Sequence, residues 1–290
     1  MSPRSIMLIG GPDSGKTNYL ARLWEALRSG DGKLHAAYVP DNIKYVEDAL
    51  TYLLQGKFAP RSDKDLEQSR RDFIIPISVE GYLGPVEIIV PDVTGELWKS
   101  AVERCELPPD WMRQLTESYG ALLFVRVLSD LNVAPLDWVT ARQMLRLQVP
   151  NPAEVDAIPT QVALCELLQF LELKLVRSSF SRRPRVAVVV TAWDRLDRDI
   201  SSAGPRAYLE REYPLFAGRL KDTEKIDIEV FGTSVVGGDL DADDQFRQKF
   251  FQTELKSSGY VVIERASAIT QEHDLTVPID WLVAGLQEAE

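Results

Sequence analysis

The sequence predicts an α/β fold whose central sheet is mostly parallel, carries one antiparallel strand and has helices on both faces. An apolar run at 6–9 precedes a glycine-containing loop and apolar residues at helical spacing over 18–27, which is the order strand, loop, helix. The continuous apolar run at 185–190 is typical of a strand buried on both faces. Two β-prone segments at 72–79 and 86–90 are separated by a short turn, so we expect them to pair antiparallel.

The loop after the first strand has the spacing of a phosphate-binding loop. Residues 10–17 read GGPDSGKT and satisfy the pattern G-x-x-x-x-G-K-[ST]. Gly10 and Gly15 let the backbone curl without a Cβ clash, so successive N–H groups can face a polyphosphate at a helix N-terminus. We expect Lys16 to reach the β- and γ-phosphates and the Thr17 hydroxyl to take one Mg²⁺ position. The predicted nucleotide contacts here are Gly10, Gly11, Asp13, Ser14, Gly15, Lys16, Thr17 and Asn18.

Length and charge limit the class of protein. The chain has 290 residues, 45% of them hydrophobic, which suffices for one enlarged domain. We expect a single domain over 1–290, with an insert at about 129–159 and a C-terminal extension at about 240–290. The net charge of −11 argues against a nucleic-acid partner or an anionic membrane, because phosphate backbones demand clustered Lys and Arg.

Cysteines, histidines and hydropathy exclude other classes of site. Cys105 and Cys165 lie far apart without a C-x-x-C pairing, so neither a disulfide framework nor a zinc site is indicated. The two histidines, His35 and His273, stand in unrelated contexts, which argues against a His-based metal cluster or triad. No stretch reaches the roughly eighteen apolar residues of a membrane span, so we expect no transmembrane segment and a cytoplasmic protein.

The segment between the first helix and the hairpin is unusually long. Residues 41–55 carry apolar side chains at helical spacing, and Gly56 stops this predicted helix. The following residues 57–62 are polar and rich in turn formers.

The second strand of the hairpin ends in a D-x-x-G sequence at 92–95. Asp92, at the carboxyl end of a strand, can hold Mg²⁺ through water, and the Gly95 N–H can approach a γ-phosphate because no side chain blocks it. Asp and Gly also dominate ordinary turns, so the motif alone has little specificity. Its position on a hairpin after a phosphate-binding loop favours the functional interpretation.

Two further motifs follow apolar strands. Thr191-Ala192-Trp193-Asp194 resembles the base-reading motif N-K-x-D of GTPases in a T-x-x-D form. A carboxylate at Asp194 can accept from the guanine N1–H and exocyclic amine, whereas adenine presents no such donor pair. Ala192 replaces the family's lysine, whose stem packs over the nucleotide, and Trp193 is the candidate substitute. The alternative interpretation of Asp194 is a solvated acidic loop residue.

The last motif follows a β-prone run at 226–232. It resembles the final GTPase loop, in which a backbone N–H meets the guanine O6. The predicted contacts are Thr233, Ser234 and Val235.

A strand at 121–128 and a leucine-rich helix at 160–175 complete the middle of the chain. Apolar helical stripes normally face a sheet, so we expect this helix in the core. The irregular insert at 129–159 is the better partner surface.

The motifs come in the order phosphate, metal, base, base, and in that order residues 1–240 resemble a TRAFAC-class Ras-like GTPase, a P-loop NTPase fold. The Gly95-Glu96 ending, the long segment before the hairpin and the sequence VPIDWL at 277–282 resemble the bacterial double-GTPase group of conflict-system and multigene loci. The resemblance implies a GTP-binding molecular switch that uses GTP/GDP and Mg²⁺. It also implies an effector or regulatory protein as partner, for example another GTPase encoded nearby.

A switch of this class needs a Ser or Thr whose hydroxyl completes the Mg²⁺ shell when the γ-phosphate is present. Ser62 is the first candidate and Ser69 the second. Arg61 is a candidate internal arginine finger, although a solvated loop arginine is commoner. We expect GTP to order the segments near 56–70 and 92–105.

Glu96 stands where Ras-like enzymes have the glutamine that orients the attacking water. A carboxylate can hydrogen-bond water but also repels the γ-phosphate, so we expect turnover no faster than roughly 10⁻³ s⁻¹ without a partner. Glutamate is also favoured in a first helical turn for purely structural reasons. Lys16 and Glu96 are the candidate catalytic residues.

Two alternatives stay open. A P-loop ATPase or kinase would share the phosphate loop, but a kinase of this fold usually lacks the antiparallel hairpin, and neither a lid nor an acceptor site is recognisable. A nucleotide-binding module without hydrolysis is the other, because Ala192 and Glu96 depart from the family pattern.

Overall fold

The computed structural model describes residues 5–30, 32–60, 73–79, 84–90, 101–102, 104, 106, 109–134, 158–175, 183–265 and 268–287. Most of the predicted insert at 129–159 lies outside these ranges. So do six candidate residues, whose roles stay predictions: Arg61, Ser62, Ser69, Asp92, Gly95 and Glu96.

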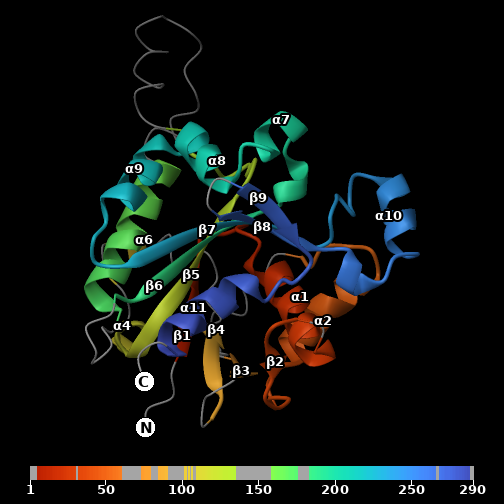
Figure 1. The fold of residues 1–290 in the computed structure, drawn as a ribbon, viewed down its shortest axis with the longest axis horizontal. Helices are drawn as coiled ribbons and strands as arrows, with labels where there is room; N and C mark the ends of the chain where they lie inside the picture. Colours follow the sequence, from red (N-terminus) through yellow and green to blue (C-terminus); the bar gives the residue numbers. More distant parts are fainter. Residues whose placement is uncertain are drawn as a thin grey trace, which may run out of the picture.

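The described strands form one nine-stranded sheet in the order β2-β3-β4-β1-β5-β6-β7-β8-β9 (Figure 1). Their bounds are β1 Ser5–Ile9, β2 His35–Ala36, β3 Phe73–Ser78, β4 Val86–Val90, β5 Ser118–Arg126, β6 Arg185–Thr191, β7 Asp227–Ser234, β8 Tyr260–Arg265 and β9 Ala268–Glu272. The central strands β4, β1, β5, β6 and β7 are parallel to their neighbours. The predicted hairpin is present, because β3 pairs antiparallel with β4. The structure adds a second antiparallel strand, β8, beside β7.

Helices cover both faces of the sheet, so the predicted α/β architecture is confirmed (Figure 1). The described helices are α1 Lys16–Ser29, α2 Lys44–Leu54, α4 Pro109–Glu117, α6 Thr160–Lys174, α7 Arg198–Ser201, α8 Pro205–Glu212, α9 Pro214–Asp222, α10 Asp244–Phe250 and α11 Val277–Gln287, with 3-10 turns η3 Trp193–Arg195 and η4 Leu255–Ser257. One face packs against α1, α2 and α11, and the other against α4, α6, α8 and α9.

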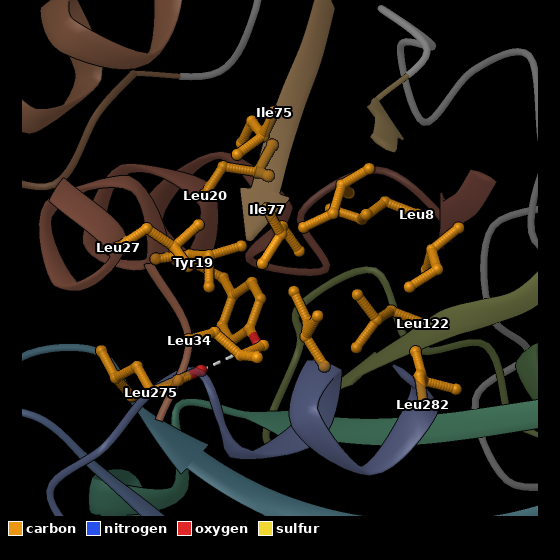
Figure 2. Close-up of a cluster of buried hydrophobic side chains, with 14 of the residues drawn as sticks. Leu8, Tyr19, Leu20, Leu27, Leu34, Ile75, Ile77, Leu122, Leu275 and Leu282 are labelled. Atoms are coloured by element: carbon orange, nitrogen blue, oxygen red, sulfur yellow. Dashed lines mark hydrogen bonds between the residues drawn. The ribbon is translucent and has the colours of Figure 1, made fainter. Parts of the chain in front are cut away.

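Tyr19 anchors the core beneath α1 (Figure 2). Its ring is fully buried and meets Phe124 of β5 edge to face, with 5.2 Å between ring centroids. Its hydroxyl donates to the Leu275 carbonyl at 3.1 Å. This hydrogen bond satisfies the one polar atom of the side chain and offsets the desolvation of the buried hydroxyl. Tyr19 thus fixes the first helix to the central sheet and to the segment that leads into α11.

A smaller third cluster joins α1 and α2 to α10 and to the loop after β7. Its buried members include Ala21, Leu53, Val236 and Phe250. The predicted C-terminal extension therefore packs beside the helix that begins at the phosphate loop.

Several predicted elements are confirmed with small changes of boundary. The helix predicted at 41–55 is α2, and Gly56 after it has a positive φ of 72°. The helix predicted at 160–175 is α6, which buries Leu164, Leu167, Leu168 and Leu171 in the core. Helices α8 and α9 were not predicted, although a proline stands at the first position of each, where proline favours helix initiation.

Within the described ranges, every helix is too short or too polar to cross a lipid bilayer.

Candidate functional site

Three of the predicted motifs, those after β1, β6 and β7, meet at one edge of the sheet. Parallel strands place their carboxyl ends on the same edge, where α/β proteins bind ligands. The phosphate loop follows β1, the T-x-x-D residues follow β6, and Ser234 ends β7.

Glycines shape the phosphate loop because its backbone packs closely on the sheet. A Cβ on Gly10 would lie 2.9 Å from the Phe124 Cβ. Gly15 has a φ of 85°, and a Cβ there would lie 2.9 Å from the Thr191 hydroxyl oxygen. A Cβ on Gly11 would meet nothing within 4 Å, so the loop is open on that side.

Lys16 is a partly buried cation whose ammonium contacts neutral acceptors. Its ammonium donates to the Gly10 carbonyl at 2.6 Å, the Gly11 carbonyl at 2.9 Å and the Ser14 hydroxyl at 3.0 Å. Burial lowers the pKa of Lys16 to about 7. Among the described residues no carboxylate forms an ion pair with it, so an anion in the loop would supply the missing countercharge. These residues therefore fit a phosphate group.

Thr17 and Asn18 already have partners in the structure. The Thr17 hydroxyl lies 3.1 Å from the Tyr45 hydroxyl of α2. The Asn18 carboxamide oxygen accepts from the Ala59 N–H at 2.9 Å, which ties α1 to the start of the predicted switch segment.

Three side chains were predicted to hold Mg²⁺, and of these only Thr17 lies within the described residues. Within the described ranges, no three His, Cys, Asp or Glu side chains gather as a metal site. Mg²⁺ in nucleotide sites usually keeps only one or two protein ligands beside the phosphates. Thr17 is the described residue that fits this role.

Asp13 is held by an arginine that the sequence analysis did not identify. Asp13 has a φ of 59°, and its carboxylate accepts from Arg126 Nη1 at 2.6 Å. Arg126 ends β5, beside the phosphate loop. Its charge offsets a carboxylate that would otherwise repel phosphate. In the sequence, only the position of this arginine directly after the apolar run 121–125 pointed to such a role.

Thr191 braces the phosphate loop from the neighbouring strand. Its hydroxyl donates to the Ser14 carbonyl at 2.9 Å. Its side chain also packs directly on Gly15, where any larger residue would collide with it. The first residue of the T-x-x-D motif thus links the predicted base site to the phosphate site.

Trp193 does not replace the missing lysine stem. Ala192 adopts a left-handed conformation with a φ of 57°, and this turn directs the next side chain into the core. Trp193 is 2% exposed, stacks edge to face on Tyr208 and lies where a Cβ on Gly232 would collide with its ring. The candidate role of Trp193 over the nucleotide is therefore wrong, because the indole is enclosed by α8 and β7.

Replacing Trp193 by alanine is expected to lower the free energy of unfolding by about 3–5 kcal/mol, because it leaves a large cavity. Urea denaturation measures this, with Tyr38→Ala, an exposed aromatic, as the control. Weaker nucleotide binding at unchanged stability would instead place Trp193 against the ligand.

Asp194 and Ser234, two residues predicted for the base site, lie close together. The Ser234 hydroxyl accepts from the Gly237 N–H at 2.8 Å and lies near the Asp194 carboxylate. Burial raises the pKa of Asp194, as does the nearby Asp239, while Ser234 and Arg195 oppose the rise. Asp194 is of intermediate exposure, and its raised pKa favours the base-site interpretation over a fully solvated loop residue.

Tyr260 lies on the other side of this carboxylate. It pairs with Ser234 across β7 and β8, and burial together with the charge of Asp194 raises the pKa of Tyr260 to about 12. Thr233 is fully buried, and its hydroxyl has no partner among the described residues. Of the predicted loop contacts, Ser234 lies beside Asp194.

As the pH is lowered, GDP affinity is expected to fall. The fall should begin at a higher pH than it would with an aspartate of ordinary pKa. The raised pKa means that Asp194 takes up its proton early, and a protonated carboxyl can no longer accept both guanine N–H groups. The ratio of GDP to ADP affinity, measured from about pH 8 to pH 5, should fall in the wild type and stay constant in Asp194→Asn. A constant ratio in the wild type would contradict this.

Comparisons with known proteins identify the chain's relatives. The family model described as Double-GTPase 1 matches residues 7–282. No curated protein matches the sequence.

Similar solved structures are distant. The signal recognition particle receptor SRb-GTP/SRX complex from Chaetomium thermophilum is 12% identical, with 86% of this chain and 98% of that chain covered and a TM-score of 0.37. The bacterial selenocysteine-specific elongation factor EF-Sec is 15% identical, with 87% and 29% covered and a TM-score of 0.34. The G domain of the T. maritima FeoB iron transporter is 13% identical, with 85% and 98% covered and a TM-score of 0.29. At these scores the likenesses carry no argument about the site.

Proposed function

Since the chain belongs to the Double-GTPase 1 family, as its motifs predicted, we propose that it is a GTP-binding and slowly GTP-hydrolysing molecular switch that acts on a protein partner. Family membership supports guanine-nucleotide binding. Slow hydrolysis, the switch action and the protein partner are the further parts of the proposal.

The observation that carries the proposal is the link between phosphate loop and base site. Thr191 donates to the Ser14 carbonyl, and three residues later Asp194 meets Ser234. A nucleotide lying along this edge would place its phosphates at Lys16 and its base at Asp194. A buried carboxylate acceptor favours guanine, because adenine offers it no pair of N–H donors.

Bound Mg²⁺ would neutralise charge shared by the β- and γ-phosphates. Thr17 fits a ligand role by its position, and Asp92 and Ser62 are the proposed further ligands, outside the described residues. Lys16 would stabilise the transferred phosphoryl charge, and Glu96 would orient the attacking water.

The family name leaves the partner open. We propose an effector or regulatory protein, for example a second GTPase encoded nearby, that contacts the segments near 56–70 and 92–105. Asn18 supports a switch at the first of these, because its hydrogen bond to Ala59 connects the phosphate-loop helix to that segment.

Single-turnover hydrolysis tests this function. Wild type with excess protein over GTP and Mg²⁺ should release phosphate slowly, at about 10⁻³ s⁻¹ or below. ATP and the Lys16→Ala variant serve as blanks. Phosphate release no faster than the Lys16→Ala blank would favour the nucleotide-binding module without hydrolysis, and faster release from ATP would favour the ATPase.

A further inference from the structure

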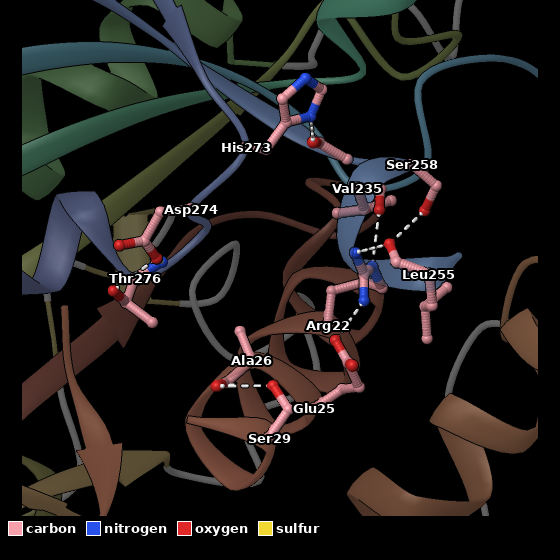
Figure 3. Close-up of polar contacts among 11 residues, drawn as sticks. Arg22, Glu25, Ala26, Ser29, Val235, Leu255, Ser258, His273, Asp274 and Thr276 are labelled. Carbon is pink, nitrogen blue, oxygen red and sulfur yellow. Dashed lines mark hydrogen bonds and ion pairs between the residues drawn. The ribbon is translucent and has the colours of Figure 1, made fainter. Parts of the chain in front are cut away.

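Arg22 is a buried charge that joins the two halves of the candidate site. It lies in α1, the helix that begins at the phosphate loop, and is 1% exposed. Its Nε donates to the Val235 carbonyl at 2.9 Å and its Nη2 to the Leu255 carbonyl at 2.6 Å (Figure 3). Its Nη1 pairs with Glu25 one turn along the same helix. All three donors therefore point at defined oxygens.

Stability alone explains this arrangement poorly. Burying a guanidinium costs desolvation free energy that its ion pair and hydrogen bonds only partly return, and an apolar side chain of similar volume often serves stability as well. A rigid fork of N–H donors is better suited to fixing distances between backbone segments. The segments fixed here are the loop after β7 and the turn before β8.

That turn packs backbone to backbone against the loop. A Cβ on Gly259 would lie 2.7 Å from the Val235 carbonyl oxygen. Gly237 has a φ of 89°, and a Cβ there would lie 2.5 Å from the Ser258 carbonyl oxygen. The His273 Nδ1 lies 2.7 Å from the Gly259 carbonyl oxygen and holds the turn from its far side (Figure 3).

The loop is thus held from two directions. Ser234 connects it to Asp194 and, through the Gly237 N–H, closes its own turn. Arg22 and Gly259 hold Val235 from the side of α1 and β8. Neither of these two residues belongs to a nucleotide-binding motif in the sequence.

We propose that Arg22 and the 255–259 turn form a base-loop brace, whose positioning residues set the 234–237 loop relative to the phosphate loop so that a guanine base fits between Asp194 and the loop backbone. The inference rests on the proposed guanine-nucleotide function. It makes base discrimination, and not phosphate affinity, the property that depends on Arg22. It also gives the C-terminal extension a part in nucleotide selection.

The test compares the dissociation constants of GDP and ADP, each with Mg²⁺, by calorimetry. The brace variants are Arg22→Lys and Gly259→Ala. Arg185→Lys is the matched control for the first, because Arg185 donates to the Trp281 carbonyl at 2.7 Å at the opposite end of β6. Gly218→Ala matches the second, since a Cβ there meets nothing within 4 Å. Urea denaturation of each variant measures stability separately.

Both brace variants should lower the GDP preference over ADP by about tenfold while the ADP dissociation constant changes less than about threefold. Both controls should keep the wild-type preference. A folded Arg22→Lys or Gly259→Ala that retains the preference overturns the brace, and so does an equal loss in Arg185→Lys. If Arg22→Lys does not fold, Gly259→Ala decides alone. A wild type without GDP preference would overturn the proposed function itself, which the first titration reveals before any variant is made.

Discussion

Replacing Lys16 by alanine is expected to weaken GDP binding about a hundredfold. The ammonium is buried among neutral oxygens of the phosphate loop, so a bound phosphate would be its main countercharge. A charge-assisted contact in such a desolvated place contributes more than one on the surface.

The same substitution should leave the free protein folded. Burial lowers the pKa of Lys16, which means that the folded state pays to keep this cation out of water. Removing it should therefore not lower the free energy of unfolding without ligand. Lys221→Ala, which removes a lysine that is 67% exposed, is the control for charge. GDP binding by Lys16→Ala within threefold of wild type would refute the assignment of the phosphate site.

Replacing Asp194 by asparagine is expected to abolish the preference for guanine over adenine, lowering GDP affinity by on the order of a hundredfold. The amide presents an N–H₂ group where the carboxylate accepted from the guanine N1–H and exocyclic amine. ADP affinity should hardly change, because the phosphate loop is untouched. An amide donor suits xanthine, which carries an oxygen at the position of the guanine amine, so XDP should gain affinity.

Asp197→Asn is the matched control for this variant. Asp197 lies three residues further along, is exposed, and caps nothing with its side chain at the start of α7. Calorimetry with GDP, ADP and XDP on both variants makes the comparison. Equal losses in both, or a GDP preference that survives Asp194→Asn, would return Asp194 to the class of solvated loop residues.

The parts of the site that the sequence predicted are those whose chemistry lies within one short segment. The phosphate loop requires its glycines and Lys16 at fixed spacing, and the T-x-x-D motif places Thr191 and Asp194 on one turn. The paired carboxyl ends of parallel strands then bring such segments together without further specification.

The parts of the site that could not be predicted from the sequence depend on contacts between segments that are far apart in the chain. Arg126 meets Asp13 across 113 positions, and Arg22 meets Leu255 across 233. Arg22 also lies within a run of α1 residues that are all buried, so no polar face marked it out.

Trp193 was assigned the wrong role for a related reason. Its direction depends on the left-handed turn at Ala192, a conformation that non-glycine residues seldom adopt and that residue type does not reveal. The antiparallel pairing of β8 with β7 was not predicted, because pairing direction depends on where the chain returns to the sheet.

The most direct test of the central claim is calorimetric titration of the wild-type protein with GDP and with ADP, each with Mg²⁺. We expect GDP to bind at least about tenfold more tightly, because only guanine offers the Asp194 carboxylate two N–H donors. Equal or tighter binding of ADP would contradict a guanine-nucleotide switch and favour the ATPase.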